Sequence, residues 1–249
     1  MTQLSVNLNK IALLRNSRGR NYPNVVEFAK RFIDLGVHGI TVHPRQDERH
    51  ITIQDTIDLG QLLAGNNEVE FNVEGYPSEQ FLSLVEKVRP TQCTLVPDAP
   101  DQLTSDHGWD LSKHKKTVTD ICTRLSAAGI RPAIFLDPEI EDVKLAAQTG
   151  TCRIELYTEA YAAAYGTPQQ EAVLAKYRSA AEEAQKLSLE LNAGHDLDLN
   201  NLQEFLSVKG ILEVSIGHAL MVECIEQGIE SVVRQYLEIC GYSETAGNL

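Results

Sequence analysis

Long apolar runs are absent from this sequence. No stretch approaches the roughly 18 apolar residues that a membrane-spanning helix needs. Asn7, Asn9 and Lys10 interrupt the N-terminus where a signal peptide would carry its apolar segment. We therefore expect a protein that is neither embedded in a membrane nor secreted.

Positive charge is also scarce. The 249 residues include 22 Lys and Arg against 35 Asp and Glu, which gives a formal net charge of −13. Such a charge repels nucleic acid and anionic lipid, so we expect no nucleic-acid or membrane partner. An anionic small molecule would have to be bound by a local group of basic side chains.

The five cysteines are widely spaced and include no Cys-x-x-Cys pair, which argues against a zinc ribbon and against a disulfide framework. Several stand in apolar segments typical of a core. We predict a cytoplasmic protein with free thiols. Cys93 is a weak candidate for a catalytic thiol, because no histidine stands near it in the sequence.

What the sequence does contain is a regular alternation of short β-rich runs with longer helical patterns. The predicted strands are Leu4–Asn9, Gly39–His43, Val69–Glu74, Gln92–Val96, Pro132–Leu136, Arg153–Tyr157, Leu189–Asn192 and Glu213–Ile216. The predicted helices are Asn24–Leu35, Ser78–Val88, Leu111–Ala128, Pro138–Gln148, Gln169–Leu187, Asn200–Ser207 and Ala219–Ile239. Glycines that would end helices stand shortly before later strands, at Gly36, Gly129, Gly150 and Gly210.

This alternation predicts parallel strands joined by right-handed crossovers, and eight such units predict a single-domain (β/α)8 TIM barrel over residues 1–242. An open, doubly wound sheet is the alternative architecture. No internal repeat, low-complexity tract or linker divides the chain. The polar tail, residues 243–249, is expected to fray.

Alternate residues of the predicted strands differ in polarity. One set is apolar: Val6, Leu8, Ile40, Val42, Phe71, Val73, Ile154, Leu156, Leu189, Leu191, Val214 and Ile216. The opposite set is largely polar: Ser5, Asn7, Asn9, Thr41, His43, Glu70, Asn72, Glu74, Arg153, Glu155, Tyr157, Glu190, Asn192, Glu213 and Ser215. Barrel interiors are normally filled by branched apolar side chains, and a buried carboxylate without a partner is costly. A polar interior must therefore form a satisfied network or bind a polar ligand.

The two ends of the barrel allow different interpretations of these polar residues. Arg153 with Glu213 or Glu190 fits a structural ion pair at the closed end. Catalytic residues of such barrels gather at the carboxyl ends of the strands. There the sequence places His43, Glu74, Glu155 and the segment around His195.

Histidines and arginines are concentrated at the same strand ends. Four of the seven histidines, His43, His50, His195 and His218, lie at or just after predicted strands. They suit acid and base chemistry near neutral pH. The loop from residue 43 to residue 50, HPRQDERH, adds Arg45 and Arg49, whose guanidinium groups match phosphate oxygens. The alternative is a solvated loop in which acidic neighbours neutralise the arginines.

Two further segments fit anion binding. Arg15, Arg18 and Arg20 follow the first strand and form a second basic patch. The turns NAGH and SIGHAL follow the seventh and eighth strands, where phosphate sites of this fold are common. Their small residues let backbone amides approach an anion at a helix N-terminus.

The same residues allow two other kinds of chemistry, a metal site and a Schiff base. A divalent metal held by His43, His195, His218, Glu74 and Glu155 is conceivable, but the local spacing of common metal sites is absent. A Schiff base would need a lysine at a strand end, and Lys10 is the one that qualifies.

Seven stretches together resemble the pyridoxine 5′-phosphate synthase family. They are VNLNKIALLRNSRG, GITVHPRQDERHI, FNVEGYP, LVPDAP, RIELYT, LNAGHDL and SIGHAL, and they run from the first strand to the eighth. The resemblance implies a (β/α)8 barrel that condenses 3-amino-2-oxopropyl phosphate with 1-deoxy-D-xylulose 5-phosphate. The products would be pyridoxine 5′-phosphate, inorganic phosphate and water. It implies acid–base catalysis, a homo-octamer, and neither a metal nor an organic cofactor.

The resemblance also implies roles for individual residues. The implied catalytic residues are His43 as proton acceptor, Glu74 as a second acid–base group, His195 as proton donor and Glu155 as transition-state stabiliser. The implied contacts to deoxyxylulose phosphate are Asn9, Lys10, Arg45, His50 and Thr104. The implied contacts to the aminoketone phosphate are Asn7, Arg18, Asp196, Gly217 and His218.

Two positions depart from the family pattern. Many members have Asp-His where this chain has Asn9-Lys10, and many have Gly where it has Asp196. Lys10 can donate to a phosphate or a hydroxyl, but it cannot accept a proton as a neutral imidazole does. Two alternatives stay open: another sugar-phosphate aldolase or isomerase, and an inactive protein that binds a phosphorylated ligand as a regulator.

Overall fold

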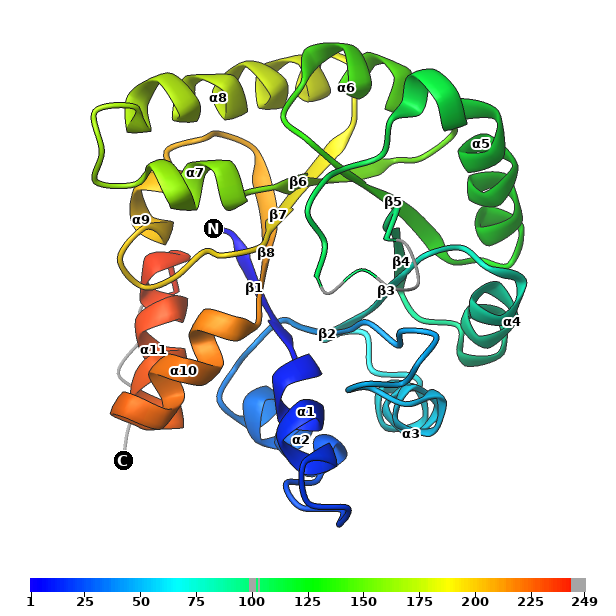
Figure 1. Cartoon of the computed structure of the whole chain (residues 1–249), viewed down its shortest axis with the longest axis vertical. Helices are drawn as coiled ribbons and strands as arrows, with labels where there is room; N and C mark the ends of the chain where they lie inside the picture. The colour runs from blue at the N-terminus through cyan, green and yellow to red at the C-terminus, as the bar shows by residue number, and fades with distance from the viewer. Residues whose placement is uncertain (99–101, 103, 243–249) are drawn as a thin grey trace.

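The computed structural model describes residues 1–98, 102 and 104–242. Eight parallel strands form a closed barrel in which each strand pairs with its neighbours in the sequence and β8 pairs with β1 (Figure 1). The strands are β1 (Gln3–Asn7), β2 (Gly39–Val42), β3 (Glu70–Gly75), β4 (Gln92–Leu95), β5 (Arg131–Leu136), β6 (Arg153–Tyr157), β7 (Glu190–Gly194) and β8 (Ile211–Ile216). The predicted (β/α)8 barrel is confirmed, and the open sheet is wrong. The prediction for residues 243–249 falls outside the described residues, as do Ala99 and Pro100 of the LVPDAP stretch.

Helices surround this barrel. They are α1 (Asn9–Asn16), α2 (Val25–Asp34), α3 (Ile53–Leu63), α4 (Glu79–Val88), α5 (Leu111–Ala127), α6 (Ile140–Ala146), α7 (Glu159–Ala164), α8 (Gln170–Lys186), α9 (Leu202–Phe205), α10 (His218–Gln227) and α11 (Ile229–Ile239). In the described part of the chain, none of them combines the length and the apolar character that crossing a membrane requires.

The helix prediction was wrong at several places. The single helix expected over Ala219–Ile239 is two helices, because Gly228 adopts a φ of +88° between α10 and α11. The first strand ends at Asn7 rather than at Asn9, where α1 begins. The helices α1, α3 and α7 were not predicted. The helix ends expected at Gly36, Gly129, Gly150 and Gly210 agree with the positive φ of all four residues.

The apolar set of strand residues packs outward against the helices. Leu4, Val6 and Ile40 are fully buried, and they belong to a single large core between the sheet and the helices. A layer of this kind is the normal product of strands whose alternate side chains face opposite sides. The alternation read from the sequence therefore assigns this face of the sheet correctly.

The opposite, polar set fills the barrel. At the closed end, Arg153 donates from Nε and Nη2 to Glu190 Oε2 at 2.9 and 2.7 Å, and from Nη1 to Glu70 and Gln92 at 3.4 and 3.2 Å. Arg131 also pairs with Glu70. The predicted pairing of Arg153 with Glu190 is confirmed, whereas Glu213 takes its hydrogen bond from Asn192 at 3.0 Å.

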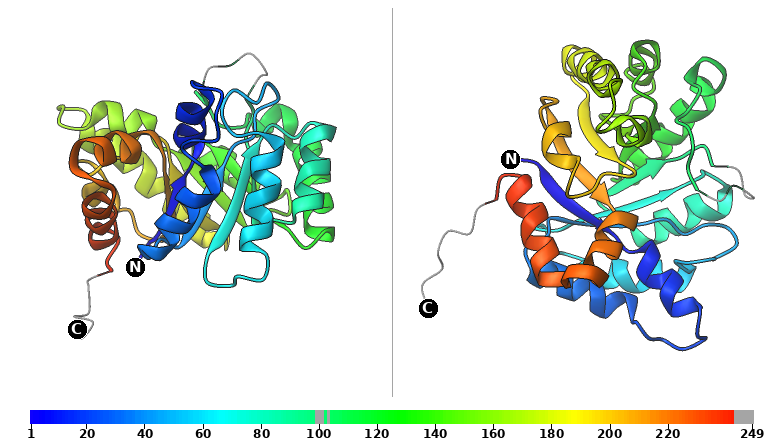
Figure 2. Two further views of the ribbon diagram at one scale, coloured as in Figure 1. Left: turned by 90° about the horizontal axis from the view of Figure 1, so that it is seen from below. Right: turned by 60° about the vertical axis from the view of Figure 1, so that its left-hand side comes forward.

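The direction of the strands identifies the opposite, open end of the barrel. Figure 2 shows the N-terminus at one end of the barrel and α1, which follows β1, at the other. Because all strands are parallel, their carboxyl ends meet at the end where α1 begins. Asn7, Glu74 and Gly194 lie there, each at or near the last residue of its strand.

The closed-end network predicts a stability effect. The side chains of Arg153 and Glu70 are only 7% and 12% exposed, and removing one partner of a buried pair costs about 3 kcal/mol or more. Arg153→Met should therefore lower the free energy of unfolding in a denaturant titration by about that amount. Lys144→Met, which removes an exposed pair with Glu141 on α6, should leave the transition almost unchanged. Equal transitions for Arg153→Met and the wild type would show that the network is not structural.

Candidate active site

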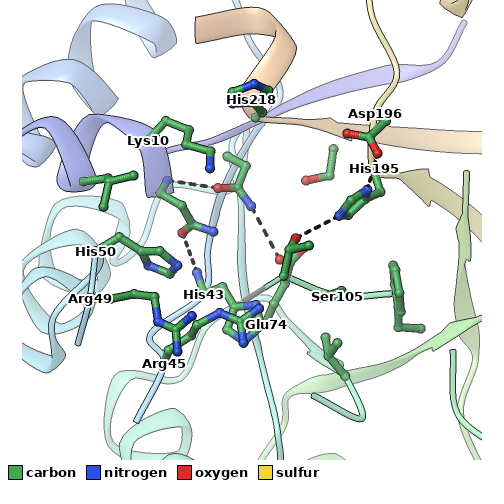
Figure 3. A pocket seen from close by; sticks show the side chains of 18 of the residues that line it. Lys10, His43, Arg45, Arg49, His50, Glu74, Ser105, His195, Asp196 and His218 are labelled. Carbon is green, nitrogen blue, oxygen red and sulfur yellow. Dashed lines mark hydrogen bonds and ion pairs between the residues drawn. The ribbon is translucent and has the colours of Figure 1, made fainter. Parts of the chain in front are cut away.

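A cavity of about 540 Å³ opens at the carboxyl ends of the strands (Figure 3). Every predicted catalytic residue lines it, and so does every predicted substrate-binding residue except Arg18. These lining residues are Asn7, Asn9, Lys10, His43, Arg45, His50, Glu74, Thr104, Glu155, His195, Asp196, Gly217 and His218. They come from strand ends and loops that are far apart in the sequence, and the fold brings them around one cavity.

Two glutamates line this cavity, Glu155 buried and Glu74 partly buried. Glu74 is the next-to-last residue of β3 and accepts a 3.5 Å hydrogen bond from Asn7 Nδ2. Burial, reinforced by the charges of Glu155, Asp98 and Glu213, raises the pKa of Glu74 well above its usual range. Burial also raises the pKa of Glu155 to about 7. Both shifts favour the protonated form, in which a carboxyl group can donate a proton.

The position of Glu155 depends on a glycine in the next strand. A Cβ atom on Gly194 of β7 would come within 2.5 Å of Glu155 Oε1. No side chain larger than hydrogen fits beside the carboxyl group in this arrangement. The hydrogen bond of Thr94 to the Glu155 carboxyl lowers the pKa of Glu155, but the effect of burial is larger.

The histidines that follow β2 are held in the neutral form. The backbone N–H of His43 donates to Asn9 Oδ1 at 2.9 Å, which ties this strand end to the start of α1. Burial, together with the charges of Arg45, His50 and Arg49, lowers the pKa of His43 well below its usual range. Burial and the charge of Arg45 likewise lower the pKa of His50 to about 4. Both rings are neutral at pH 7, so His43 can accept a proton.

His195 lies on the opposite wall and is oriented from both ring nitrogens. Nδ1 is 2.9 Å from Asp196 Oδ2, and Nε2 is 3.2 Å from Thr104 Oγ1. Thr158 Oγ1 donates to the Gly194 carbonyl at 2.8 Å and thereby holds the preceding strand end. The hydrogen bond from His195 lowers the pKa of Asp196, so this carboxylate stays ionised beside the ring.

The backbone at His195 and Asp196 is unusual. Their φ angles are +89° and +58°, in the left-handed region that non-glycine residues rarely adopt. Aspartate is among the few side chains that tolerate this region. The structure thus explains how Asp196 can stand where many members of the resembling family have glycine.

Basic side chains form one wall of the cavity. Arg45 Nη2 lies 2.6 Å from Asp98 Oδ2, and Arg45 and Arg49 both donate to the Gln102 carbonyl, at 3.3 and 3.0 Å. Lys10 extends from the first turn of α1 toward the cavity centre (Figure 3). These cations give an acidic protein a local site for an anion.

A second candidate anion site lies where β8 meets α10. Gly217 is the N-cap of α10, and no side chain in the described part of the chain caps this helix end. The first N–H groups of a helix attract anions when they lack such a cap. Gly217 and His218 both line the cavity. The cavity can therefore accept two anionic groups, one on each side.

Two expectations about basic and thiol residues need correction. Arg15 does not belong to an open basic patch, because its guanidinium is buried against Asp55. Arg18 is exposed and does not line the cavity, so the basic patch predicted after the first strand is not assembled there. Cys93 is fully buried, and its burial raises the pKa of the thiol, which leaves no reactive thiolate.

Six further residues of the described chain line the cavity: Leu13, Val96, Ser105 and Phe135, which the sequence did not single out, and Arg49 and Ser215, which it did not assign to the site. Ser215 and Arg49 carried a signal, since one belongs to the inward polar set and the other to the basic loop. Phe135 pairs in register with Glu155, so strand alternation would have placed it inside. Ser105 lies in a long loop without periodicity, where no signal existed. No group of three or more His, Cys, Asp or Glu in the described ranges is arranged to hold a metal ion.

Solved structures with the same architecture include enzymes of other kinds. The tryptophan synthase alpha-subunit of Pyrococcus furiosus superposes with a TM-score of 0.63 at 15% identity, covering 97% of this chain and 98% of that one. A 4-hydroxy-2-oxoglutarate aldolase superposes with a TM-score of 0.62 at 10% identity, covering 96% and 94%. At such identities the likeness concerns the fold alone.

Sequence relatives are far more similar. The pyridoxine 5′-phosphate synthase of Porphyromonas gingivalis is 49% identical over 237 residues, which cover 95% of this chain and 98% of the relative. That of Leptospira biflexa is 45% identical over 252 aligned positions, covering 96% and 97%. The family model described as pyridoxal phosphate biosynthesis protein PdxJ matches residues 4–242. With the resemblance thus confirmed over nearly the whole length, this chain belongs to the PdxJ family of pyridoxal phosphate biosynthesis proteins.

Proposed function

We propose that the protein is a pyridoxine 5′-phosphate synthase. It condenses 3-amino-2-oxopropyl phosphate with 1-deoxy-D-xylulose 5-phosphate and releases pyridoxine 5′-phosphate, inorganic phosphate and water. The observation that carries this proposal is the arrangement of two carboxyl groups with raised pKa values and two imidazoles with lowered pKa values in one cavity beside cationic side chains. The names of relatives that match nearly the whole chain support it.

The sequence of reactions explains why one cavity needs several acid–base groups. An imine forms between the amine of one substrate and the ketone of the other with loss of water, and the remaining steps are eliminations and a ring closure that ends with a further loss of water. Each departure of water needs a proton on the leaving oxygen, and the raised pKa of Glu74 suits this carboxyl group to supply it. Each removal of a proton from carbon needs a base, and neutral His43 meets that requirement.

The two phosphates match the two anion sites. We assign deoxyxylulose phosphate to Asn9, Lys10, Arg45, His50 and Thr104. We assign the aminoketone phosphate to Asn7, Gly217, His218 and the backbone of Asp196, with Arg18 as the predicted contact that this chain does not place in the cavity. In this assignment Lys10 acts as a hydrogen-bond donor, His195 donates a proton and Glu155 stabilises the transition state. No metal or organic cofactor is part of the proposal.

The setting of the enzyme belongs to the same proposal. The free cysteines, with no disulfide among the described residues, suit a reducing cytoplasm. A homo-octamer is the assembly that the family resemblance implies. Both statements are open to direct test by fractionation and by light scattering.

The test of the activity is incubation of purified protein with both substrates. We expect pyridoxine 5′-phosphate, identified by mass, and inorganic phosphate in equal amounts. Omission of either substrate should abolish both products. Binding of the substrates without turnover would favour the inactive regulator, and turnover of a different sugar phosphate would favour an aldolase or isomerase.

Substitutions of Glu74 and His195 test the catalytic roles that we assign to these residues. Glu74→Gln and His195→Asn should each lower kcat by about 10²–10⁴, the usual contribution of a positioned acid or base. The thermal midpoint should change little. A neutral glutamine resembles the protonated Glu74, and asparagine tolerates the left-handed backbone at position 195. Turnover within about threefold of the wild type would remove these residues from the mechanism.

A further inference from the structure

Arg15 lies in the last turn of α1 and is almost completely buried, although it is an arginine on a helix near the protein surface. Its side chain is 11% exposed, and so is that of Asp55. Both terminal nitrogens contact the Asp55 carboxylate, with Nη2 to Oδ2 at 2.8 Å. Such a two-point pair fixes both the distance and the orientation of its partners.

Asp55 is itself fixed at the start of α3. Its Oδ2 accepts from the backbone N–H and the hydroxyl of Thr52, both at 2.8 Å, and Thr52 Oγ1 accepts from the Asp55 backbone N–H at 3.1 Å. This capping box defines the first turn of α3. The ion pair therefore joins the end of α1 to the beginning of α3.

The last turn of α1 also binds the loop that leads into α3. The His50 carbonyl accepts from Arg15 Nη2 at 3.3 Å and from Asn16 Nδ2 at 2.9 Å. The Arg49 carbonyl accepts from Asn16 Nδ2 at 3.1 Å. These two carbonyls belong to residues that line the cavity.

The contacts of the His50 backbone also determine which ring nitrogen of His50 faces the cavity. Nδ1 of His50 accepts from the Ile51 backbone N–H at 2.9 Å, so in the neutral ring the proton resides on Nε2. The ring lies at the cavity, between Lys10 and Arg49 (Figure 3). Its remaining polar atom is thus a hydrogen-bond donor, the character that a phosphate oxygen requires.

We propose that Arg15 is a positioning residue, which acts through the His50 carbonyl and Asp55 to hold His50 and Arg49 against the phosphate of one substrate. The inference rests on the proposed function, because it takes deoxyxylulose phosphate as the ligand on this wall. Arg15 itself does not line the cavity. Its effect should therefore fall on binding of that substrate and not on the chemical steps.

Arg15→Met and Asn16→Ala test this role, with Arg124→Met as the matched control. Arg124 also binds a carboxylate with two nitrogens, Glu86 at 2.7 and 3.0 Å, but between α5 and α4. Arg15→Met should raise KM for deoxyxylulose phosphate about 10- to 100-fold, the usual consequence of misplacing a binding group. Asn16→Ala should raise it by a smaller factor. KM for the aminoketone phosphate and kcat should stay close to the wild-type values, and Arg124→Met should change neither KM.

A loss of kcat in Arg15→Met in proportion to the unfolded fraction, with both KM values unchanged, would overturn the proposal and leave a purely structural role. If Arg15→Met does not fold, Asn16→Ala decides, since an unchanged KM there contradicts the proposal. Titration with inorganic phosphate, followed by the His50 ring resonances, separates this inference from the proposed activity. If the wild type makes no product, the proposed activity is wrong. Weaker phosphate binding in the variants than in the wild type would still support the positioning role. Equal phosphate binding in the variants and the wild type would overturn that role.

Discussion

The cost of burying charge inside the barrel is the constraint on which the rest of this structure depends. Strand alternation places Glu70, Glu74, Glu155 and Glu213 in an interior that similar barrels fill with apolar side chains. A buried carboxylate needs either a cation or a proton. Glu70 has cations, because Arg131 and Arg153 both reach it. The others lie farther along the barrel, where burial raises the pKa values of their side chains.

The two ends of the barrel therefore differ in role. The carboxylates at the closed end belong to the network that stabilises the fold, and those at the open end lie where the proposed chemistry takes place. The closed end uses arginine to satisfy its carboxylates, whereas at the open end burial raises the pKa values of Glu74 and Glu155 and favours their protonated forms. The sign of the resulting pH dependence is fixed by the raised pKa values. Glu155 binds its proton more tightly in the folded state, so it favours folding most below its ordinary pKa of 4.5, and this contribution is lost as the pH rises to about 7. An enzyme with such a site gives up stability near neutral pH to keep an acid available.

Much of this could be predicted from the sequence, because the signals were local. Period-two alternation identified the inward set, and the carboxyl ends of the strands identified His43, Glu74, Glu155 and His195. The failures involve partners that are distant in the sequence. Nothing near Arg15 indicates Asp55, forty positions later, so a buried ion pair was interpreted as an open basic patch. A helical pattern likewise continues across residue 228 unless the backbone conformation of that glycine is known.

The protonation of the open-end carboxyl groups is the central claim, and infrared difference spectroscopy tests it most directly. Spectra of the wild type against Glu74→Gln at pH 7 should contain the carbonyl stretch of a protonated carboxylic acid that the variant lacks. The corresponding band of Glu155, identified with Glu155→Gln, should disappear with a midpoint near pH 7. If both residues give only carboxylate bands at pH 6, Glu74 and Glu155 are ionised in the interior, and neither can act as a proton donor there.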